Sequence, residues 1–469
     1  MNPPASSTAI ARGSGPWWRD LTSYHWFVFA MASLAWLFDC LDQQLFLLAR
    51  GSAMKALLPP GSDLKEYGGY ATAIFIAGWA TGGLILGAVG DRKGRARTLT
   101  LAVLMYSVCT GLSAFSTGWL DFAFYRFITG LGVGGVFGLA VALIADSLPE
   151  RSRPGALGSL QALSAVGNIT AGAVSMTLGH LEGTTFAAGT AWKYMFLIGA
   201  FPAFLCVFLQ MRLKEPEKWV QARAASRQTG ARFGSYASLF GEARWRRPAL
   251  IGMLLCVAGV VGLWGVGFFS PELVGDVLDR SLRSQGVDPK LIPGQKTFWA
   301  GVNMITQNLG SFFGMIVFTR AAQRFGRKPA FAVAFVCAFI ATVGYFQLFN
   351  RMQDIWMSFI MGFCQLALFA GFAIYLPELF PLRLRSTGTS FCYNVGRFIA
   401  ASGPFTLGRL QAWLAQDATT AEARLTAFRS AACYLSAVFL LGLLALLALP
   451  ETKGRPLPED QPTAPGPEP

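Results

Sequence analysis

The sequence predicts an all-α membrane protein in which twelve transmembrane helices form two pseudo-symmetric six-helix bundles around a central cavity. Of the 469 residues, 53% are apolar and only 14% are charged, whereas a soluble domain carries about 25% charged residues. The remaining charges gather in short clusters between apolar runs of about 20 residues, the length that crosses a hydrocarbon core of about 30 Å. An internal repeat, described below, divides these runs into two equivalent sets. The composition excludes a soluble enzyme, a disordered chain and a disulfide-stapled fold.

Each expected span is an apolar run bounded by charged or helix-breaking residues. The first run is of full length and no cleavage pattern follows it, so we expect it to remain as a span. The predicted spans cover residues 24–48, 67–89, 97–116, 119–143, 155–179, 192–211, 247–270, 297–319, 329–348, 354–377, 386–411 and 427–449.

The charged stretch 212–246 separates six spans from six. We therefore expect an N-terminal bundle in 1–211, a cytoplasmic linker in 212–246, a C-terminal bundle in 247–449 and a proline-rich, disordered tail in 450–469. Within the linker, residues 217–223 fit either a short interfacial helix or a plain charged loop.

The distribution of basic residues predicts the direction of the spans. An even number of spans puts both termini on one side, and the loops of that side carry 25 Lys and Arg residues against 12 on the other. The positive-inside rule then places both termini in the cytoplasm, as expected of a multi-pass protein of the cell inner membrane. Because the basic residues flank spans rather than form a stripe, the net charge of +14 is not taken to indicate nucleic-acid binding.

Cysteine and histidine usage gives no sign of a metal or cofactor site. The eight cysteines are scattered singly through apolar runs, and the chain has two histidines, too few for a typical zinc or haem site. We expect no cofactor and no metal, and we interpret the thiols as small packing residues.

The two halves superpose in sequence at a constant offset of 232 residues. The matched positions place Arg92, Gly94 and Arg95 on Arg324, Gly326 and Arg327, Phe127, Ile128 and Gly130 on Phe359, Ile360 and Gly362, and Asp146, Pro149 and Arg153 on Glu378, Pro381 and Arg385. Duplicated bundles of this kind rock against each other and expose a central site to each side in turn. This geometry is typical of a transporter.

Four ionisable residues stand out deep inside predicted spans, namely Asp39, Asp42, Arg126 and Arg397. Each costs about 2.5–3.5 kcal/mol near the membrane centre and therefore needs a partner or a function. At about 1.5 Å per residue, Asp42 and Arg126 both lie about 10 Å below the outer surface and can pair. Proton binding at Asp42 would release Arg126, although a permanent pair that locks two helices is the alternative.

Asp39 lies one helical turn from Asp42. Two carboxylates at this spacing disfavour double ionisation, so either residue can be the proton acceptor. A capping or water-binding role is the alternative for Asp39.

Arg397 lies about 16 Å deep, with no acid of its own half at that depth. An unpaired guanidinium near the midplane indicates an anionic, carboxylate-bearing substrate, and hydrogen bonding to backbone carbonyls is the alternative. Other polar residues of the spans fit a cavity lining or interhelical bonds. The candidate substrate contacts are Arg397, Asn394, Gln161, Asn168, Asn303, Gln307 and Gln365, and the tryptophans Trp36, Trp79 and Trp264 with Tyr393 are possible stacking partners for a ring.

The loop Gly87–Arg97 resembles the cytoplasmic signature loop of the major facilitator superfamily. The Pro216-Glu217 and Pro450-Glu451 pairs resemble that family's exits from spans six and twelve, and residues 16–26 with 36–42 resemble its branch of sialate, metabolite and aromatic-acid proton symporters. The resemblance implies alternating access and a proton-coupling Asp–Arg pair in spans one and four. Two departures stand out: Gly134–Gly138 lacks the glutamate that many members of the branch carry in span four, and Gln323 replaces the signature acid in the second half.

The loop itself indicates a gate. Gly90 and Gly94 permit a tight turn, and Asp91 can bridge to basic groups or to the positive N-terminal end of a neighbouring helix when the cytoplasmic side is shut. A basic cluster that only sets topology is the alternative. The expected gate residues are Gly90, Asp91, Arg92, Gly94, Arg95, Glu378 and Arg385.

We therefore expect a proton-coupled symporter that imports a small organic acid or acidic sugar and acts on that substrate and protons within the lipid bilayer, as a monomer. A neutral sugar or polyol symporter and a drug exporter are the alternatives among transporters. A nutrient sensor without transport is an alternative of another class. An enzyme is not expected, because no nucleophile–base pair, metal cluster or phosphate loop falls at one depth.

Overall fold

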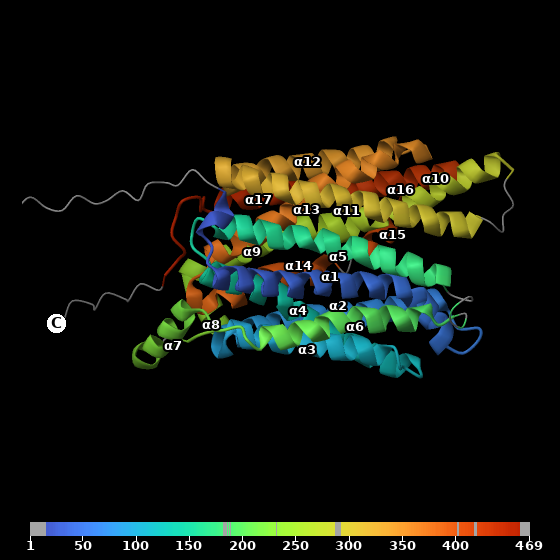
Figure 1. Ribbon diagram of the computed structural model, residues 1–469. Helices are drawn as coiled ribbons and strands as arrows, with labels where there is room; N and C mark the ends of the chain where they lie inside the picture. Colours follow the sequence, from blue (N-terminus) through green and yellow to red (C-terminus); the bar gives the residue numbers. More distant parts are fainter. Residues whose placement is uncertain are drawn as a thin grey trace, which may run out of the picture.

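The computed structural model describes residues 16–181, 185, 187, 189–230, 232–286, 292–400, 403–416 and 420–459. In these ranges the only regular secondary structure is helical. The long helices run side by side along one axis, with most of the first six in the lower half of Figure 1 and most of the last six in the upper half. The described chain begins and ends at the same end of the bundle, where α7 and α8 also lie. This is the end that the basic residues assign to the cytoplasm, and it is called the predicted cytoplasmic end below.

The first six predicted spans each correspond to one helix, which confirms them; most ends shift by four residues or fewer, but α1 continues to Leu57, nine residues past the predicted end at 48. A short 3-10 helix, η1 (Trp17–Asp20), precedes them. The six helices are α1 (Ser23–Leu57), α2 (Leu64–Lys93), α3 (Arg95–Ser113), α4 (Trp119–Ser147), α5 (Arg153–Leu181) and α6 (Ala191–Gln210).

The second half repeats this pattern with more breaks. Its helices are α9 (Ala243–Val261), α10 (Ser270–Ser284), α11 (Ile292–Phe325), α12 (Arg327–Leu348), α13 (Trp356–Tyr375), α14 (Arg385–Ala400), α15 (Gly403–Leu414), α16 (Ala421–Ser436) and α17 (Val438–Ala448). The eleventh span is described as α14 and α15, with residues 401 and 402 between them outside the described residues, and the twelfth comprises α16 and α17. Short 3-10 turns, η4 (Met352–Ile355), η5 (Leu376–Leu379) and η6 (Leu382–Leu384), flank α13 and precede α14.

The seventh span departs from its prediction as a single helix over 247–270. After α9 the chain passes through a π-helical turn, η2 (Gly262–Val266), and a 3-10 turn, η3 (Gly267–Phe269), before α10 begins with a proline in its first turn. Three glycines within six residues weaken the helix here, and a proline in the first turn favours a new helix start. The span is therefore broken near its middle.

Eight helical segments of the described chain are long and apolar enough to cross a membrane. The helices α5, α11 and α14 are not among the eight. These three carry the amides or the arginine that the sequence singles out as a polar lining, and they lie where the halves meet, since α5 packs on α11 and α14 packs on α2 and α4. These three helices therefore bring the predicted polar residues to the interface between the two halves.

The linker contains two helices, α7 (Glu217–Thr229) and α8 (Tyr236–Gly241), so the helical interpretation of residues 217–223 is confirmed. The linker is bonded to the end of α2: Trp219 Nε1 donates to the carbonyl oxygen of Asp91 at 2.9 Å, and Arg92 Nε donates to that of Gly234 at 3.1 Å. The described part of the tail, 450–459, contains no helix, and residues 460–469 lie outside the described residues.

Equivalent caps support the pseudo-symmetry of the halves. Gly94 precedes α3 with φ of 113°, and Gly326 precedes α12 with φ of 110°, values that favour glycine. Glu215 accepts hydrogen bonds from three backbone N–H groups at the start of α3, and Glu451 accepts two at the start of α12. Partial burial acts to raise the pKa of the Glu451 carboxyl, but its backbone donors outweigh this and hold that pKa below its ordinary value.

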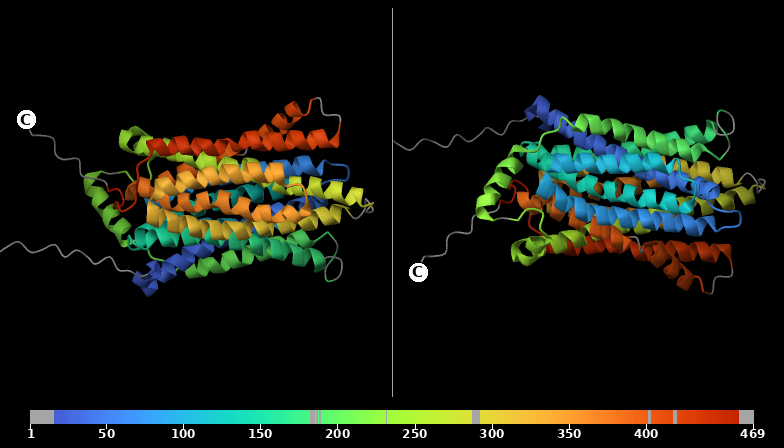
Figure 2. Two further views of the ribbon diagram at one scale, coloured as in Figure 1. Left: turned by 90° about the horizontal axis from the view of Figure 1, so that it is seen from above. Right: turned by 90° about the horizontal axis from the view of Figure 1, so that it is seen from below.

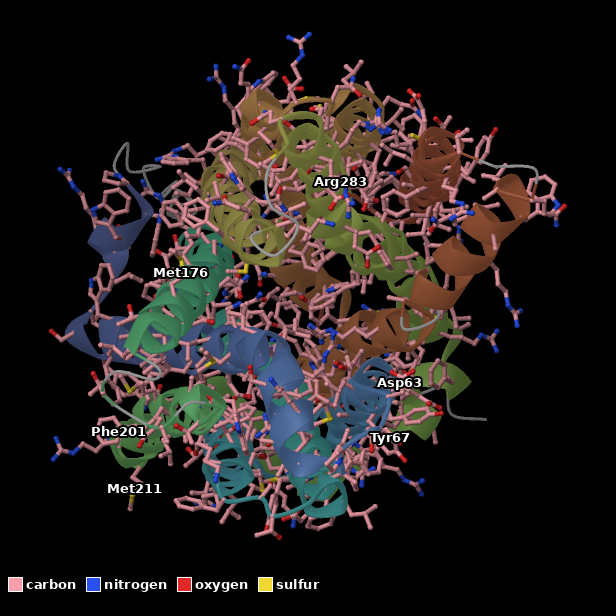
Figure 3. The ribbon with its side chains drawn as sticks, turned by 90° about the vertical axis from the view of Figure 1, so that its right-hand side faces the viewer. Asp63, Tyr67, Met176, Phe201, Met211 and Arg283 are labelled. Carbon is pink, nitrogen blue, oxygen red and sulfur yellow. The ribbon has the colours of Figure 1, made fainter. Side chains whose placement is uncertain are left out.

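The opposite end of the bundle is formed by loops and helix ends. Figure 3 looks at this end and shows Asp63 and Tyr67 at the connection from α1 to α2, and Arg283 near the end of α10. The two views of Figure 2 show α7 and α8 far from it, at the predicted cytoplasmic end. The linker therefore does not contact the opposite end.

Candidate functional site

At the predicted cytoplasmic end, Asp91 joins the two halves. Its Oδ2 accepts hydrogen bonds from the backbone N–H of Thr387 at 2.8 Å and from Thr387 Oγ1 at 2.7 Å. Its Oδ1 accepts from the backbone N–H of Ser386 and from Arg95 Nη2, both at 3.2 Å. Asp91 is fully buried and thus caps the N-terminus of α14, the positive end of that helix. The contact has the form expected of a closed gate.

A buried ion-pair cluster lies beside this cap. Asp146 pairs with Arg95, whose Nε lies 2.7 Å from Oδ2, and with Arg385 of the other half. In the second half the equivalent residues also pair: Arg327 Nη2 lies 2.8 Å from Glu378 Oε1. Arg385 and the Arg95–Asp146 pair thus bridge the halves, whereas the Arg327–Glu378 pair lies within the second half.

The glycines of α4 explain the missing glutamate of span four. A side chain at Gly134 would overlap the backbone of Trp79, and one at Gly138 would overlap Ser390 of α14. The closed packing of α4 against α2 and α14 therefore requires glycine at these positions. A glutamate at Gly134 or Gly138 would demand a wider separation.

Asp42 and Arg126 meet inside the first half, as the sequence predicts. Both side chains are fully buried, and Asp42 Oδ2 lies 4.0 Å from Arg126 Nη1. Thr110 donates to Asp42 Oδ1 at 2.7 Å, and Ser113 accepts from Arg126 Nη2 at 2.8 Å. The guanidinium also lies 4.7 Å from the ring of Phe196. The ion pair is long, and α3 hydroxyls bond both of its members.

Asp39 is fully buried one turn away on α1. Gln43 Nε2 donates to its Oδ2 at 2.9 Å, while its Oδ1 has no hydrogen-bond partner among the described residues. Asp39 interacts electrostatically with Asp42 and with Arg397 of the other half. Its carboxylate is therefore near enough to be influenced by the charges of Asp42 and Arg397, and it forms no ion pair with an arginine in the described chain.

Arg397 lies between aromatic rings of the two halves. Its guanidinium carbon is 3.7 Å from the ring centre of Trp79 on α2 and 4.2 Å from that of Tyr393 on α14. Its Nη1 donates to Asn394 Oδ1 at 3.0 Å, its Nε has no partner among the described residues, and the residue is 6% exposed. Within the described chain, Arg397 forms no ion pair. The guanidinium is thus oriented but not neutralised by a close carboxylate.

The remaining predicted lining residues separate into two groups. Asn168 Nδ2 donates to Asn308 Oδ1 at 2.9 Å across the α5–α11 interface, while the Oε1 atoms of Gln161 and Gln365 are buried without partners in the described chain.

Asn303, by contrast, is occupied by its own half. It donates to Ser270, accepts from Tyr345 and Ser358, and is fully buried. Gln307 accepts from Ser270 at 3.5 Å. This network joins α10 to α11, α12 and α13, so its groups are used in holding the broken seventh span.

The sequence profile of the Major Facilitator Superfamily matches residues 44–404. The chain belongs to this superfamily. It is 28% identical over 442 residues to a putative metabolite transport protein of Haemophilus influenzae, a match that covers 93% of this chain and 99% of that protein. It is 27% identical over 336 residues to the sialic acid transporter NanX of Escherichia coli, covering 69% and 73% of the two chains.

A solved structure of the proton:xylose symporter XylE shares the fold. The TM-score is 0.68 at 18% identity, and the alignment covers 93% of this chain and 98% of that one. The chain is therefore a multi-pass membrane transporter of the superfamily rather than an enzyme.

Several residues near the charged groups of this superfamily member were not predicted as functional. Thr110 and Ser113 bond the Asp42–Arg126 pair, and Glu215 caps α3. Hydroxyls in an apolar helix are a weak signal, because most bond their own backbone, as Thr98 does. The sequence predicts Trp79 only as a possible stacking partner for a ring, because nothing in its spacing indicates that it meets Arg397 of the other half.

Replacing Asp91 with asparagine is expected to reduce transport about tenfold at unchanged abundance in the membrane. The asparagine keeps the shape but loses the charge that caps α14 and pairs with Arg95, and a capping charge in a buried setting contributes about 1–2 kcal/mol. Uptake in vesicles, normalised to the protein present, measures this. Turnover equal to that of the wild type would contradict the role of Asp91 in closing the gate.

Proposed function

We propose that this transporter is a proton-coupled symporter that imports small carboxylic acids, including acidic sugars, by alternating access. The observation that carries the proposal is the Arg397 guanidinium, buried between the two halves without an ion-pair partner in the described chain. A buried charge of this kind is costly unless a counter-ion completes it. A carboxylate can accept two hydrogen bonds from one edge of a guanidinium. An anionic substrate is therefore its natural complement.

The proton would bind at Asp42. When Asp42 is ionised it attracts Arg126, and protonation leaves Arg126 to its hydroxyl, carbonyl and aromatic neighbours on α3, α4 and α6. The 4.0 Å separation supports an exchangeable pair, because Asp42 already shares its charge with Thr110. One proton carried with one monoanion moves no net charge, so a pH gradient of one unit supports about tenfold accumulation.

We also propose an orientation of the protein in the membrane and a division of the chain into two bundles and a linker. Both termini would face the cytoplasm of a cell whose inner membrane holds the protein, with bundles in 1–211 and 247–449 joined by the linker 212–246. The Asp91 cap and the Asp146 cluster close the predicted cytoplasmic end, so the described conformation would be open to the outside or occluded. Opening that end would break these contacts and release the substrate inward.

A pH-gradient uptake assay tests the proposal. Purified protein in liposomes is given an acidic exterior, and radiolabelled monocarboxylates, sugar acids and neutral sugars are compared as initial rates. Protein-free liposomes are subtracted, because neutral acids cross lipid unaided. We expect gradient-dependent uptake of at least one acid and none of the neutral sugars. Uptake of a neutral sugar alone would overturn the anion assignment.

A further inference from the structure

The anion site at Arg397 continues directly into the contacts that close the predicted cytoplasmic end. Along α2, residues 79, 83, 87 and 91 follow one face in steps of four. Along α14, each has a counterpart: Trp79 covers Arg397, Gly83 packs on Asn394, Gly87 packs on Ser390, and Asp91 caps Ser386 and Thr387. We call this series of contacts the α2–α14 seam. The innermost contact of the seam is the one that covers the arginine.

The two helices pack so closely along the seam that we expect its contacts to separate together. A side chain on Gly83 would overlap the Asn394 amide, and one on Gly87 would overlap the Ser390 side chain. Asn394 in turn accepts from Arg397 and donates to the Ser390 carbonyl oxygen at 2.9 Å. A movement of α2 away from α14 that opens the predicted cytoplasmic end therefore also withdraws Trp79 from Arg397.

The aromatic rings over Arg397 restrict the directions from which its guanidinium can bind an anion. Trp79 and Tyr393 lie over the guanidinium at 3.7 and 4.2 Å, and Asn394 takes one Nη1 hydrogen. The Nε hydrogen is left buried without a partner in the described chain. A carboxylate can accept from Nε and the neighbouring Nη2 in the plane of the group. The rings thus hold the arginine with the Nε hydrogen of that edge unbonded in the described chain.

We propose that Trp79 is a positioning residue that makes Arg397 a state-dependent anion site. The indole fixes the guanidinium while the predicted cytoplasmic end is closed and leaves it when that end opens, so a carboxylate is held tightly in the closed state and released in the open one. The identity of the anion rests on the proposed function, whereas the coupling of Trp79 to closure does not. A desolvated cation–π contact corresponds to roughly a tenfold change or more in the balance of states.

The test needs no substrate and no proton gradient. Full-length protein in lipid nanodiscs is examined by hydrogen exchange of peptides covering 383–392, which reports seam opening, and by modification of Arg397 with phenylglyoxal, which reports its cover. Trp79→Leu is expected to raise both rates about tenfold, and Trp79→Phe should restore most of the protection. Trp192→Leu is the matched control, because Trp192 is also buried and lies against a cationic side chain, Lys193, on α6, which packs on α1 and α3 rather than on the seam.

Two further variants make the result decisive. Asp91→Asn weakens the seam at the predicted cytoplasmic end and leaves Trp79 intact. It should raise both the phenylglyoxal modification of Arg397 and the hydrogen exchange of peptides 383–392. Trp79→Leu combined with Arg397→Gln should raise seam exchange no more than either change alone, because both remove the same contact. Trp79→Leu could expose Arg397 to phenylglyoxal and yet leave the hydrogen exchange of peptides 383–392 unchanged. In that case the indole only shields Arg397, and the proposed coupling between Trp79 and closure of the seam is refuted. Equal effects of Trp192→Leu would refute it too. A failed uptake screen with a coupled seam would refute only the proposed function.

Discussion

Uptake of carboxylates should fall at least about a hundredfold when Arg397 is replaced by glutamine. Removing one member of a buried charge pair costs about 2–5 kcal/mol, much of it from the charge left unpaired, and 2.8 kcal/mol corresponds to a hundredfold change. Glutamine also loses the stacked guanidinium plane that Trp79 and Tyr393 cover. Initial rates in proteoliposomes, measured over a range of substrate concentrations, separate the loss of affinity from the loss of turnover.

Arg397→Lys is the companion variant for this measurement. Lysine keeps the positive charge but not the planar pair of donors, so it should recover part of the binding and leave discrimination among carboxylates weaker. Neutral sugars provide the specificity control. If glutamine at position 397 abolished transport of a neutral sugar as fully as that of acids, the guanidinium would serve the conformational cycle and not anion recognition.

The second large effect is expected from Asp42→Asn, which should abolish accumulation driven by a pH gradient while exchange of substrate across the membrane continues. The asparagine cannot take up the transported proton, yet it can still accept a hydrogen bond from Thr110, as Asp42 Oδ1 does at 2.7 Å. With a gradient of one pH unit, accumulation should drop from about tenfold to none. Counterflow of labelled substrate against unlabelled substrate, at equal pH on both sides, measures the exchange.

Asp39→Asn is the matched control for Asp42→Asn, because it removes a buried carboxylate one turn away that has no arginine within ion-pair distance in the described chain. It should lower rates but leave a pH-gradient-dependent component. If Asp39→Asn abolished gradient-driven accumulation while Asp42→Asn kept it, the proton would be carried by Asp39. The assignment to the Asp42–Arg126 pair would then be wrong.

The spans could be predicted because a bilayer imposes a length and a composition on every helix that crosses it. The Asp91 contact was also predictable, since a lone acid in a basic loop needs a positive partner and a helix N-terminus provides one. The break in the seventh span was less visible. Glycines such as those at 262, 265 and 267 also occur in continuous transmembrane helices, and the hydrogen bond from Asn303 to Ser270 at the start of α10 joins residues far apart in sequence.

Roles within the polar lining could not be assigned from spacing alone. Asn303 and Gln307 lie one turn apart and look equivalent to Gln161 and Asn168, but Tyr345 and Ser358 from two other helices use the Asn303 amide. Likewise, Trp79 and Arg397 are 318 residues apart in sequence, and only the packing of α2 on α14 brings them together. Contacts of this kind depend on how helices pair, which hydropathy does not encode.

Substrate-induced proton movement is the most direct test of the account, whose central claim is that a carboxylate at Arg397 and a proton at Asp42 cross together. Proteoliposomes that contain a pH-sensitive dye and start at equal pH are given an acid already identified by uptake. The account predicts acidification of the interior at a rate that matches the uptake of the anion, and loss of both signals in Arg397→Gln. Anion uptake by the wild type with no accompanying proton influx would contradict it.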